Sequence, residues 1–448
     1  MQSAFQVTYR ATPDVTSHSA ICPSTPSPLN HEQLSEIHEE FIRLNGNHEI
    51  QFKEVREKGS LEVSKGKNQG EHHVFSQLIQ PQVNATSQGE ASFCWVYANL
   101  SLLSINFIRD NNLPPSFQFS AAFFMFYDKL EKANLFLHKI VQLKEVPLRS
   151  EEMKRMLKEP FEEGGETCGF ANIVNKYGLA PLDSMPHSFS MKSTKFLNRA
   201  LYTHLRFCAQ DLREGKGDIN CMIADIYKIL AVNLGVPPNK FDWVGRDGHI
   251  DQIAEITPLQ FASEYVKYHS EDYIELGNNP LEDYGTLFEA DRYRNTIEGS
   301  AHRYVNVKMD DILNLIDQSL DKGHPLLVAS DVRIGKHDGD GIFDATYAYD
   351  KPLYNENRPL NREDALRYNH IDCWHLMVIT GYTPQQRYQI LNSWGHEMGK
   401  QGYFSMSVQY ARLNLYRIII KTEFVSEQIK EIWKTAKPRQ LGYEDLIL

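Results

Sequence analysis

Cysteine is scarce in this sequence, and long apolar runs are missing. The 448 residues include six cysteines without the dense, regular spacing of a disulfide framework, so we expect free thiols in a reducing compartment. No run approaches the roughly 18 to 20 apolar residues of a membrane span. Thr, Ser, Asp and His interrupt the segment Met1–Ala20, where a signal peptide would be apolar. We therefore expect a soluble, cytoplasmic protein without a membrane partner.

Basic residues are also fewer than acidic residues. Lys and Arg total 47 against 58 Asp and Glu, which gives a formal net charge of −11 and a surface that repels phosphate backbones. Nucleic acid is therefore not an expected partner. A hydrophobic fraction of 42% and an aromatic fraction of 11% are typical of globular proteins and exclude a mainly disordered or fibrous chain.

The N-terminal part of the chain changes character near residue 28. Residues 1–28 contain four prolines and no apolar period, so we expect a flexible arm. Between Leu29 and Leu44, apolar residues recur at intervals of three and four positions, which predicts an amphipathic helix. A larger folded region follows.

The middle of the chain is rich in helical patterns, and its C-terminal part is rich in strand patterns. The predicted helices are Cys94–Arg109, a helix capped by Ser120, Glu151–Leu157, Phe170–Tyr177 and Leu197–Leu212. The predicted strands are Pro325–Ser330, Leu376–Thr380, Arg387–Leu391, Gly402–Val408 and Tyr416–Phe424. Helices followed by a mostly antiparallel sheet or barrel indicate an α+β fold.

Cys94 stands at the predicted start of a helix, at the end of the segment Gln88-Gly89-Glu90-Ala91-Ser92-Phe93-Cys94. The helix dipole and the free backbone N–H groups there favour an anion, so we expect this thiol to ionise more easily than a thiol in solution. A lone cysteine is more often a buried, unreactive residue. The residues later in the chain favour the reactive alternative.

A histidine and an asparagine complete a catalytic set. His375 precedes an apolar strand, and Asn392 follows a second strand in the motif Asn-Ser-Trp-Gly. A thiol nucleophile needs an imidazole to take its proton, and the imidazole needs a partner that fixes its tautomer. Gln88 has a side-chain N–H that suits an oxyanion, alongside the backbone N–H of Cys94. We therefore interpret Cys94, His375, Asn392 and Gln88 as catalytic residues.

These motifs resemble the papain superfamily of cysteine peptidases, and more narrowly its bleomycin hydrolase and aminopeptidase C branch. Three further stretches carry the narrower resemblance, which extends over roughly Leu29 to Val425: Phe119–Asn134, Gly164–Pro181 and Ser330–Asp344. The resemblance implies a papain-like core of two lobes. Cys94 would lie in a helical lobe, His375 and Asn392 on an antiparallel β-barrel lobe, and a long helical insertion would occupy residues 110–320.

The resemblance also implies features of the whole protein. In the family, a C-terminal tail lies in the cleft and restricts the enzyme to the amino ends of substrates, and the chains form hexameric rings. Residues 426–448 would be that tail, although their sequence differs from the family's. Ala91 replaces a disulfide cysteine, which fits the intracellular branch. Phe93 and Leu376 are larger than the family's usual residues, and a narrower cleft is one expected effect of Phe93.

No metal ion or other cofactor is expected. Cys373 and His375 lie two positions apart on a presumed strand, as in a metal pair, but no CxxC motif or second histidine cluster supports zinc. Cys168, in the segment Gly-Gly-Glu-Thr-Cys-Gly, resembles a nucleophile turn. A plain helix start near the cleft explains Cys168 better.

The expected function is that of a cysteine-type peptidase, an aminopeptidase that cleaves short peptides through a Cys-His-Asn triad and a thioester acyl-enzyme. Two alternatives use the same residues: an acyl transferase that carries out transamidation, and a catalytically inactive homologue that binds peptides. The sequence does not separate them, because the acyl-enzyme is common to all the reactive versions.

Overall fold

Two units make up the computed structural model, which describes residues 28–45, 49–58, 72–243, 253–333, 336–337, 340–345, 361–371 and 375–442. The first unit, Met1–Gly59, contains α1 (His31–Asn45) and α2 (Glu49–Lys58), and the rings of Phe41 and Phe52 stack at 5.5 Å between these helices. Helix α1 confirms the predicted amphipathic helix. The predicted arm lies outside the described residues apart from its last position.

The second unit, Ser60–Leu448, contains the other described helices. Its helices are α4 (Cys94–Asn111), α5 (Ala121–Gln142), α6 (Glu151–Lys158), α7 (Thr167–Tyr177), α8 (Phe189–Lys192), α9 (Lys195–Arg213), α10 (Ile219–Leu234), α11 (Pro258–Gln260), α12 (Met309–Asp321), α14 (Arg362–Arg367), α15 (Val408–Asn414) and α16 (Glu427–Thr435). Ser120 caps α5 as predicted, because its hydroxyl accepts the N–H of Phe123 at 3.1 Å. Among the described helices, none combines the length and the apolar character that a bilayer crossing requires.

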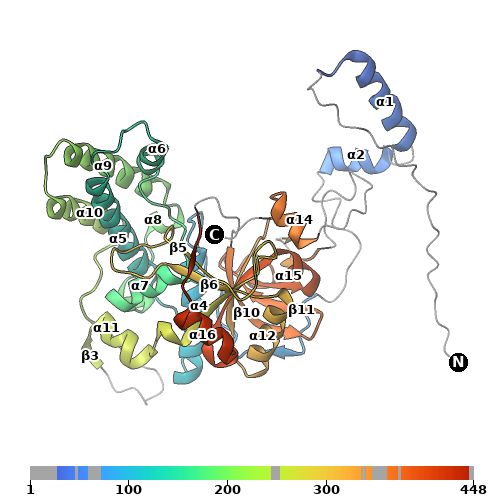
Figure 1. Cartoon of the computed structure of the whole chain (residues 1–448). Coiled ribbons are helices and arrows are strands. Elements are labelled where there is room, and N and C mark those ends of the chain that lie inside the picture. Colours follow the sequence, from blue (N-terminus) through green and yellow to red (C-terminus); the bar gives the residue numbers. More distant parts are fainter. Residues whose placement is uncertain are drawn as a thin grey trace. The chain divides into compact units, whose positions relative to one another are not determined.

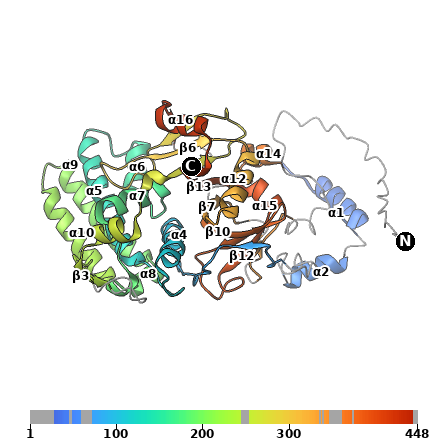
Figure 2. The same cartoon turned by 90° about the horizontal axis from the view of Figure 1, so that it is seen from below.

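Helix α4 lies at the centre of the second unit because it is apolar on all sides. The four successive residues Trp95 to Ala98 are all buried, and successive helix residues point about 100° apart. A helix of this kind is stable only when protein covers it completely. Figures 1 and 2 show α5, α7, α9 and α10 on one side of α4 and strands β7 and β10 on the other.

The strands of the second unit form one large, mostly antiparallel sheet and one small hairpin. The hairpin is β2 (Phe241–Trp243) with β3 (Ile253–Ile256). The large sheet has the order β14 (Arg439–Gln440), β5 (Leu287–Ala290), β6 (His302–Asn306), β4 (Tyr273–Gly277), β13 (Leu415–Lys421), β7 (Leu326–Ser330), β10 (His375–Thr383), β11 (Arg387–Leu391), β12 (Tyr403–Ser407), β9 (Ile342–Phe343) and β8 (Lys336–His337), and β1 (Gln77–Leu78) pairs with β10.

The mixed helix-and-strand architecture confirms the coarse prediction, but the range 110–320 is not purely helical. Strands β4, β5 and β6 lie within it and belong to the large sheet. The sequences of β4 and β6 hide the strand pattern because these strands bury polar side chains: Glu275, His302 and Asn306 are all buried. A pattern that expects apolar residues on the buried face misses such strands.

The chain returns to the sheet at its C-terminal end. Helix α16 is followed by β14, which pairs in parallel with β5, and the N–H of Leu441 donates to the carbonyl of Glu289 at 2.8 Å. The described part of the predicted tail, 426–442, therefore packs as a helix and an edge strand. Residues 443–448 lie outside the described residues, and tail gating of the cleft stays a prediction.

Candidate active site

A cleft of about 610 Å³ lies where α4 packs against β10. Its lining includes Gln88, Cys94, His375 and Leu376. β10 pairs with β7 on one side and β11 on the other, which places His375 opposite Ser330 at the end of the strand. The fold thus brings segments from the two predicted regions, helical and sheet, to one cavity.

Cys94 is the first residue of α4, as predicted. The residue is partly exposed and lines the cleft. Burial raises the pKa of the thiol to about 11, although backbone N–H groups, above all that of Leu376, act to lower it. The expectation of an easily ionised thiol is therefore wrong, because the cost of burying a thiolate exceeds the benefit of the helix start. The Leu376 contact also places the sulfur beside the first residues of β10.

His375, the first residue of β10, is held by Asn392. Its Nε2 lies 2.8 Å from the Oδ1 of Asn392. The same oxygen accepts the backbone N–H of Ser393 at 2.7 Å, which identifies it as the acceptor and Nε2 as the nitrogen that carries the ring proton. In a neutral imidazole with this tautomer, Nδ1 is the basic nitrogen.

Aromatic rings cover the pair formed by His375 and Asn392. The indole of Trp394 stacks on the imidazole at 4.9 Å with an interplanar angle of 27°, and Phe343 and Phe404 pack against the indole. His375 is 6% exposed and Asn392 is 2% exposed. The hydrogen bond between them therefore lies in a low-dielectric environment, where it is stronger than in water.

Gln88 is held in place by Ser393 and by its own turn. Its Oε1 accepts the hydroxyl of Ser393 at 2.6 Å, its Nε2 donates to the carbonyl of Ala91 at 2.8 Å, and its backbone N–H donates to the carbonyl of Ser393 at 2.9 Å. The amide nitrogen carries a second hydrogen, which suits an oxyanion in the cleft.

Phe93 lies in the core and does not line the cleft. Phe93 is 0% exposed, and its ring lies 5.4 Å from that of Trp95 and 6.3 Å from that of Phe124. It fills the core beneath the turn and is not among the described residues that line the cleft, so it does not narrow the cleft. Leu376, in contrast, lines the cleft beside His375.

A buried ionic cluster contributes to another wall of the cleft. Arg417 of β13, which is 1% exposed, donates to Glu166 at 2.7 Å and to Glu275 at 2.9 Å, and it also contacts His302. The possible ligand atoms of Glu166, Glu275 and His302 lie within 4.8 Å of one another, as in a metal site. Burial lowers the pKa of His302 well below its usual value, and Arg417 lowers it further. The guanidinium supplies positive charge among these groups, so the cluster is explained without a cation.

Cys168 lies near a second cavity, of about 270 Å³, which Glu275 and Tyr268 also line. Burial raises the pKa of this thiol, and the carboxylates of Glu166 and Glu275 raise it further. No histidine is among the described residues around this cavity. Among its described lining residues, this cavity therefore offers Cys168 no base comparable to His375.

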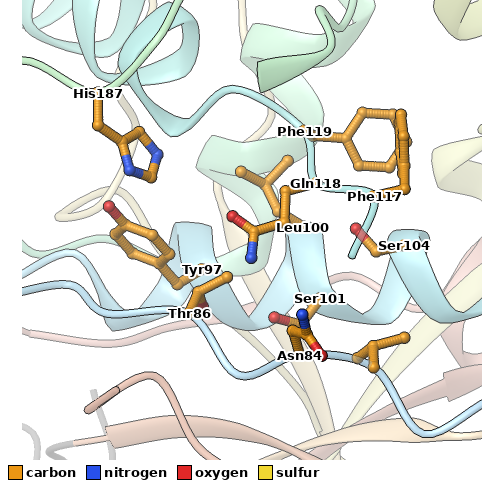
Figure 3. A pocket seen from close by; sticks show the side chains of 11 residues that line it. Asn84, Thr86, Tyr97, Leu100, Ser101, Ser104, Phe117, Gln118, Phe119 and His187 are labelled. Carbon is orange, nitrogen blue, oxygen red and sulfur yellow. The ribbon is translucent and has the colours of Figure 1, made fainter. Parts of the chain in front are cut away.

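A third cavity, beside α4, holds about 10 Å³. Figure 3 shows Tyr97 and His187 next to each other in its lining, with ring centroids 6.2 Å apart, and Gln118 in the same lining. A space of this size accommodates about one water molecule. Its lining contains no thiol or carboxylate, so we assign it no chemistry.

The cleft thus contains Gln88, Cys94 and His375, with Asn392 behind the histidine. Cys373, the other half of the rejected zinc pair, lies outside the described residues. The roles of Ser393 and Arg417 were not predicted from the sequence. Ser393 belongs to the Asn-Ser-Trp-Gly motif, and its place next to Asn392 could have indicated a role in the site. Arg417 interrupts an apolar strand, where an uncompensated charge would be costly. Its position could therefore have indicated buried partners of opposite charge.

Comparisons with known proteins show the family to which the chain belongs. The Peptidase C1-like family matches residues 28–446. Cysteine proteinase 1, mitochondrial, of Saccharomyces cerevisiae is 29% identical over 394 residues, which cover 82% of this chain and 80% of the relative. Aminopeptidase C of Listeria monocytogenes is 28% identical over 373 residues, which cover 80% of this chain and 84% of the relative.

A solved structure shows the same fold. The crystal structure of pepw from Lactobacillus rhamnosis matches with a TM-score of 0.85 and 24% identity, and the match covers 94% of this chain and 99% of the other. The family match likewise spans most of the chain. The resemblance indicated by the motifs is confirmed: the chain belongs to the Peptidase C1-like family and is a cysteine peptidase.

Proposed function

We propose that this protein is an aminopeptidase that cleaves short peptides, with Cys94 as nucleophile, His375 as acid and base, Asn392 as the residue that orients His375, and Gln88 as an oxyanion donor. One observation carries the proposal: the imidazole fixed by Asn392, with Nδ1 as its basic nitrogen, lines the same cleft as Cys94. The name of the Listeria relative, Aminopeptidase C, supports the choice of exopeptidase.

The first half of the reaction forms a thioester. Burial raises the pKa of the Cys94 thiol, and in the proposed step the proton passes from sulfur to Nδ1 of His375 as sulfur attacks the peptide carbonyl carbon. The carbonyl oxygen becomes an oxyanion that accepts hydrogen bonds from Nε2 of Gln88 and the backbone N–H of Cys94. When the C–N bond breaks, His375 gives its proton to the leaving amine.

The second half of the reaction releases the acyl group. Water attacks the thioester while Nδ1 of His375 takes one of its protons, and the same two donors stabilise the second oxyanion. The C–S bond breaks, the carboxylic acid leaves, and the proton on His375 returns to the sulfur of Cys94. Throughout, Asn392 keeps Nε2 protonated, so that Nδ1 alone exchanges protons.

The proposal extends to the whole protein. We include the papain-like division into a helical lobe and a barrel lobe with an insertion at 110–320, an assembly of several copies, and a cytoplasmic location. We also include the tail in the cleft: removal of Asp445–Leu448 should then permit internal cleavage of longer peptides. An unchanged product pattern would count against tail gating, and sedimentation measures the assembly.

A peptide panel tests the reaction class. Fluorogenic aminoacyl substrates with a free amino terminus are compared with acetylated versions of the same substrates, with and without an added amine acceptor, and the products are identified by mass spectrometry. An aminopeptidase releases single residues from the free peptides only. Transfer of the acyl group to the acceptor would identify a transferase, and binding without any product would identify an inactive homologue.

A further inference from the structure

We propose that Glu163 is a positioning residue that holds the turn carrying the oxyanion donors from the side of the helical region. The inference rests on the proposed function, because it concerns the backbone N–H of Cys94 and the side chain of Gln88. Glu163 itself lines the cleft, but its carboxylate bonds to protein groups and not to the reacting atoms.

The carboxylate of Glu163 accepts four hydrogen bonds. Its Oε2 accepts the backbone N–H of Ser92 at 3.0 Å and the hydroxyl of Thr194 at 2.9 Å. Its Oε1 accepts Nζ of Lys129 at 2.7 Å and Nδ2 of Asn198 at 3.1 Å. Lys129 belongs to α5 and Asn198 to α9, so two helices fix the carboxylate in front of the turn.

These partners keep Glu163 ionised although it is largely enclosed. Burial alone would raise the pKa of Glu163, but the ammonium of Lys129 and the donors from Ser92 and Thr194 together lower the pKa to about 2. Burial lowers the pKa of Lys129, and Glu163 beside it acts in the opposite direction. We treat the pair as charged because four donors point at one carboxylate. An anion fixed in this way binds the Ser92 N–H more strongly than a neutral acceptor would.

The remainder of the turn has independent attachments. Gly89 has a φ of 60°, and a Cβ atom there would lie 2.4 Å from the carbonyl oxygen of Lys192, so the turn passes close to the helical region at a position that requires glycine. The N–H of Glu90 donates to the same carbonyl at 2.9 Å. Gln88 is bonded to Ser393 on the sheet side. Loss of Glu163 should therefore loosen Ser92 and the N–H of Cys94 without releasing the whole turn.

The isosteric variant Glu163→Gln isolates this role. The glutamine side chain has the same shape, but an NH2 group replaces one of the two carboxylate oxygens. This NH2 group then faces another donor, either Nζ of Lys129 or the N–H of Ser92, and cannot accept a hydrogen bond from it. Glu282→Gln is the matched control. Glu282 carries another partly buried carboxylate, which pairs with Arg439 at 2.6 Å, and it is not among the described residues that line the cleft.

Three measurements separate positioning from other effects. The first is kcat and KM for an aminoacyl substrate, and the second is the affinity for a peptide aldehyde, whose thiol adduct carries an oxygen in the oxyanion site. The third is the rate at which iodoacetamide alkylates Cys94, a reaction that uses no oxyanion donor. In Glu163→Gln we expect kcat and aldehyde affinity to fall by about tenfold to a hundredfold. KM and the alkylation rate should stay close to wild type, and Glu282→Gln should leave all three measurements unchanged.

Two results would overturn the inference: unchanged aldehyde affinity in folded Glu163→Gln, or an equal loss of alkylation and aldehyde affinity. If Glu163→Gln does not fold, Glu163→Asp is measured in the same way, since it keeps the charge but is too short to reach both Lys129 and Ser92. Failure of the proposed function looks different. In that case the wild-type protein itself shows no turnover and no alkylation of Cys94, and the inference falls with it.

Discussion

Cys94 and Cys168 occupy comparable places, near the first turns of the two buried helices α4 and α7, and burial raises the pKa of both thiols. Their neighbours differ. The carboxylate of Glu166 raises the pKa of both thiols, but the thiol of Cys94 also receives a backbone N–H from β10 beside His375, whereas Glu275 raises the pKa of Cys168 further. The start of a helix is thus not enough to make a buried thiol reactive, and a base within the same cleft is the feature that separates the two sites.

The largest expected effect is the loss of the Cys94 thiol. Cys94→Ala should lower turnover by more than about a thousandfold, because no acyl-enzyme can form. Turnover of a fluorogenic peptide and the site of iodoacetamide labelling, located by mass spectrometry, are the measurements. Cys168→Ala is the matched control and should keep most of both. Substantial turnover in Cys94→Ala would contradict the role of Cys94 as nucleophile. Loss of turnover in a folded Cys168→Ala protein would show that Cys168 is also required.

Removal of the base should make Cys94 behave like Cys168. His375→Ala is expected to lower turnover by about a hundredfold to ten-thousandfold. A raised pKa favours the neutral thiol, so without an imidazole the thiolate fraction grows as the pH rises toward about 11. The alkylation rate of Cys94 should then increase by about tenfold per pH unit above neutrality. A plateau below pH 8 in this variant would show that another group ionises the thiol.

A smaller effect is expected when the orientation of His375 is weakened. Asn392→Ala removes the acceptor of Nε2, so the imidazole is free to adopt the other tautomer, and turnover should fall by about tenfold to a hundredfold. The matched control is Asn414→Ala, which removes another buried asparagine whose side chain bonds only to its own helix. Equal losses in both variants would indicate a general packing effect, and the thermal midpoint of each variant shows its folding.

The smallest expected effect concerns stability and the turn before Cys94. Because the folded-state pKa of Glu163 is lowered to about 2, its ionisation adds stability that is complete above the unfolded value of about 4.3. This contribution is lost as the pH falls through about 2. The difference in thermal midpoint between wild type and Glu163→Gln should therefore shrink from pH 6 to pH 3. A difference that stays constant would mean that the charge of Glu163 contributes little.

The apolar spacing of the sequence was sufficient to predict the helices and strands that carry the site. Helix α4 and strands β10 and β11 present apolar residues at regular intervals, and α5 begins at a recognisable cap. Strands β4 and β6 were missed because Glu275 and His302 occupy buried positions, where they are stabilised by contact with Arg417. Only the folded chain brings that arginine to them.

In the candidate site, too, some features were predictable from the sequence and others depend on the tertiary structure. The sequence was sufficient to predict that Cys94, His375, Asn392 and Gln88 lie together, because a thiol nucleophile requires partners of these types. The pKa of Cys94 was not predictable, since it depends on how much protein surrounds the sulfur. The role proposed for Glu163 had no local signal either, because its partners come from separate helices that meet only in the tertiary structure.

The position of Arg417 has a consequence for how the sequence of this protein can change. Replacing Arg417 alone would leave Glu166 and Glu275 without their common counter-ion, and replacing one of the two glutamates would alter the charge balance beside the cleft. Compensated replacement by apolar residues of similar volume would avoid both penalties. Substitutions at these positions should therefore be strongly interdependent, and a change tolerated in one background should be harmful in another.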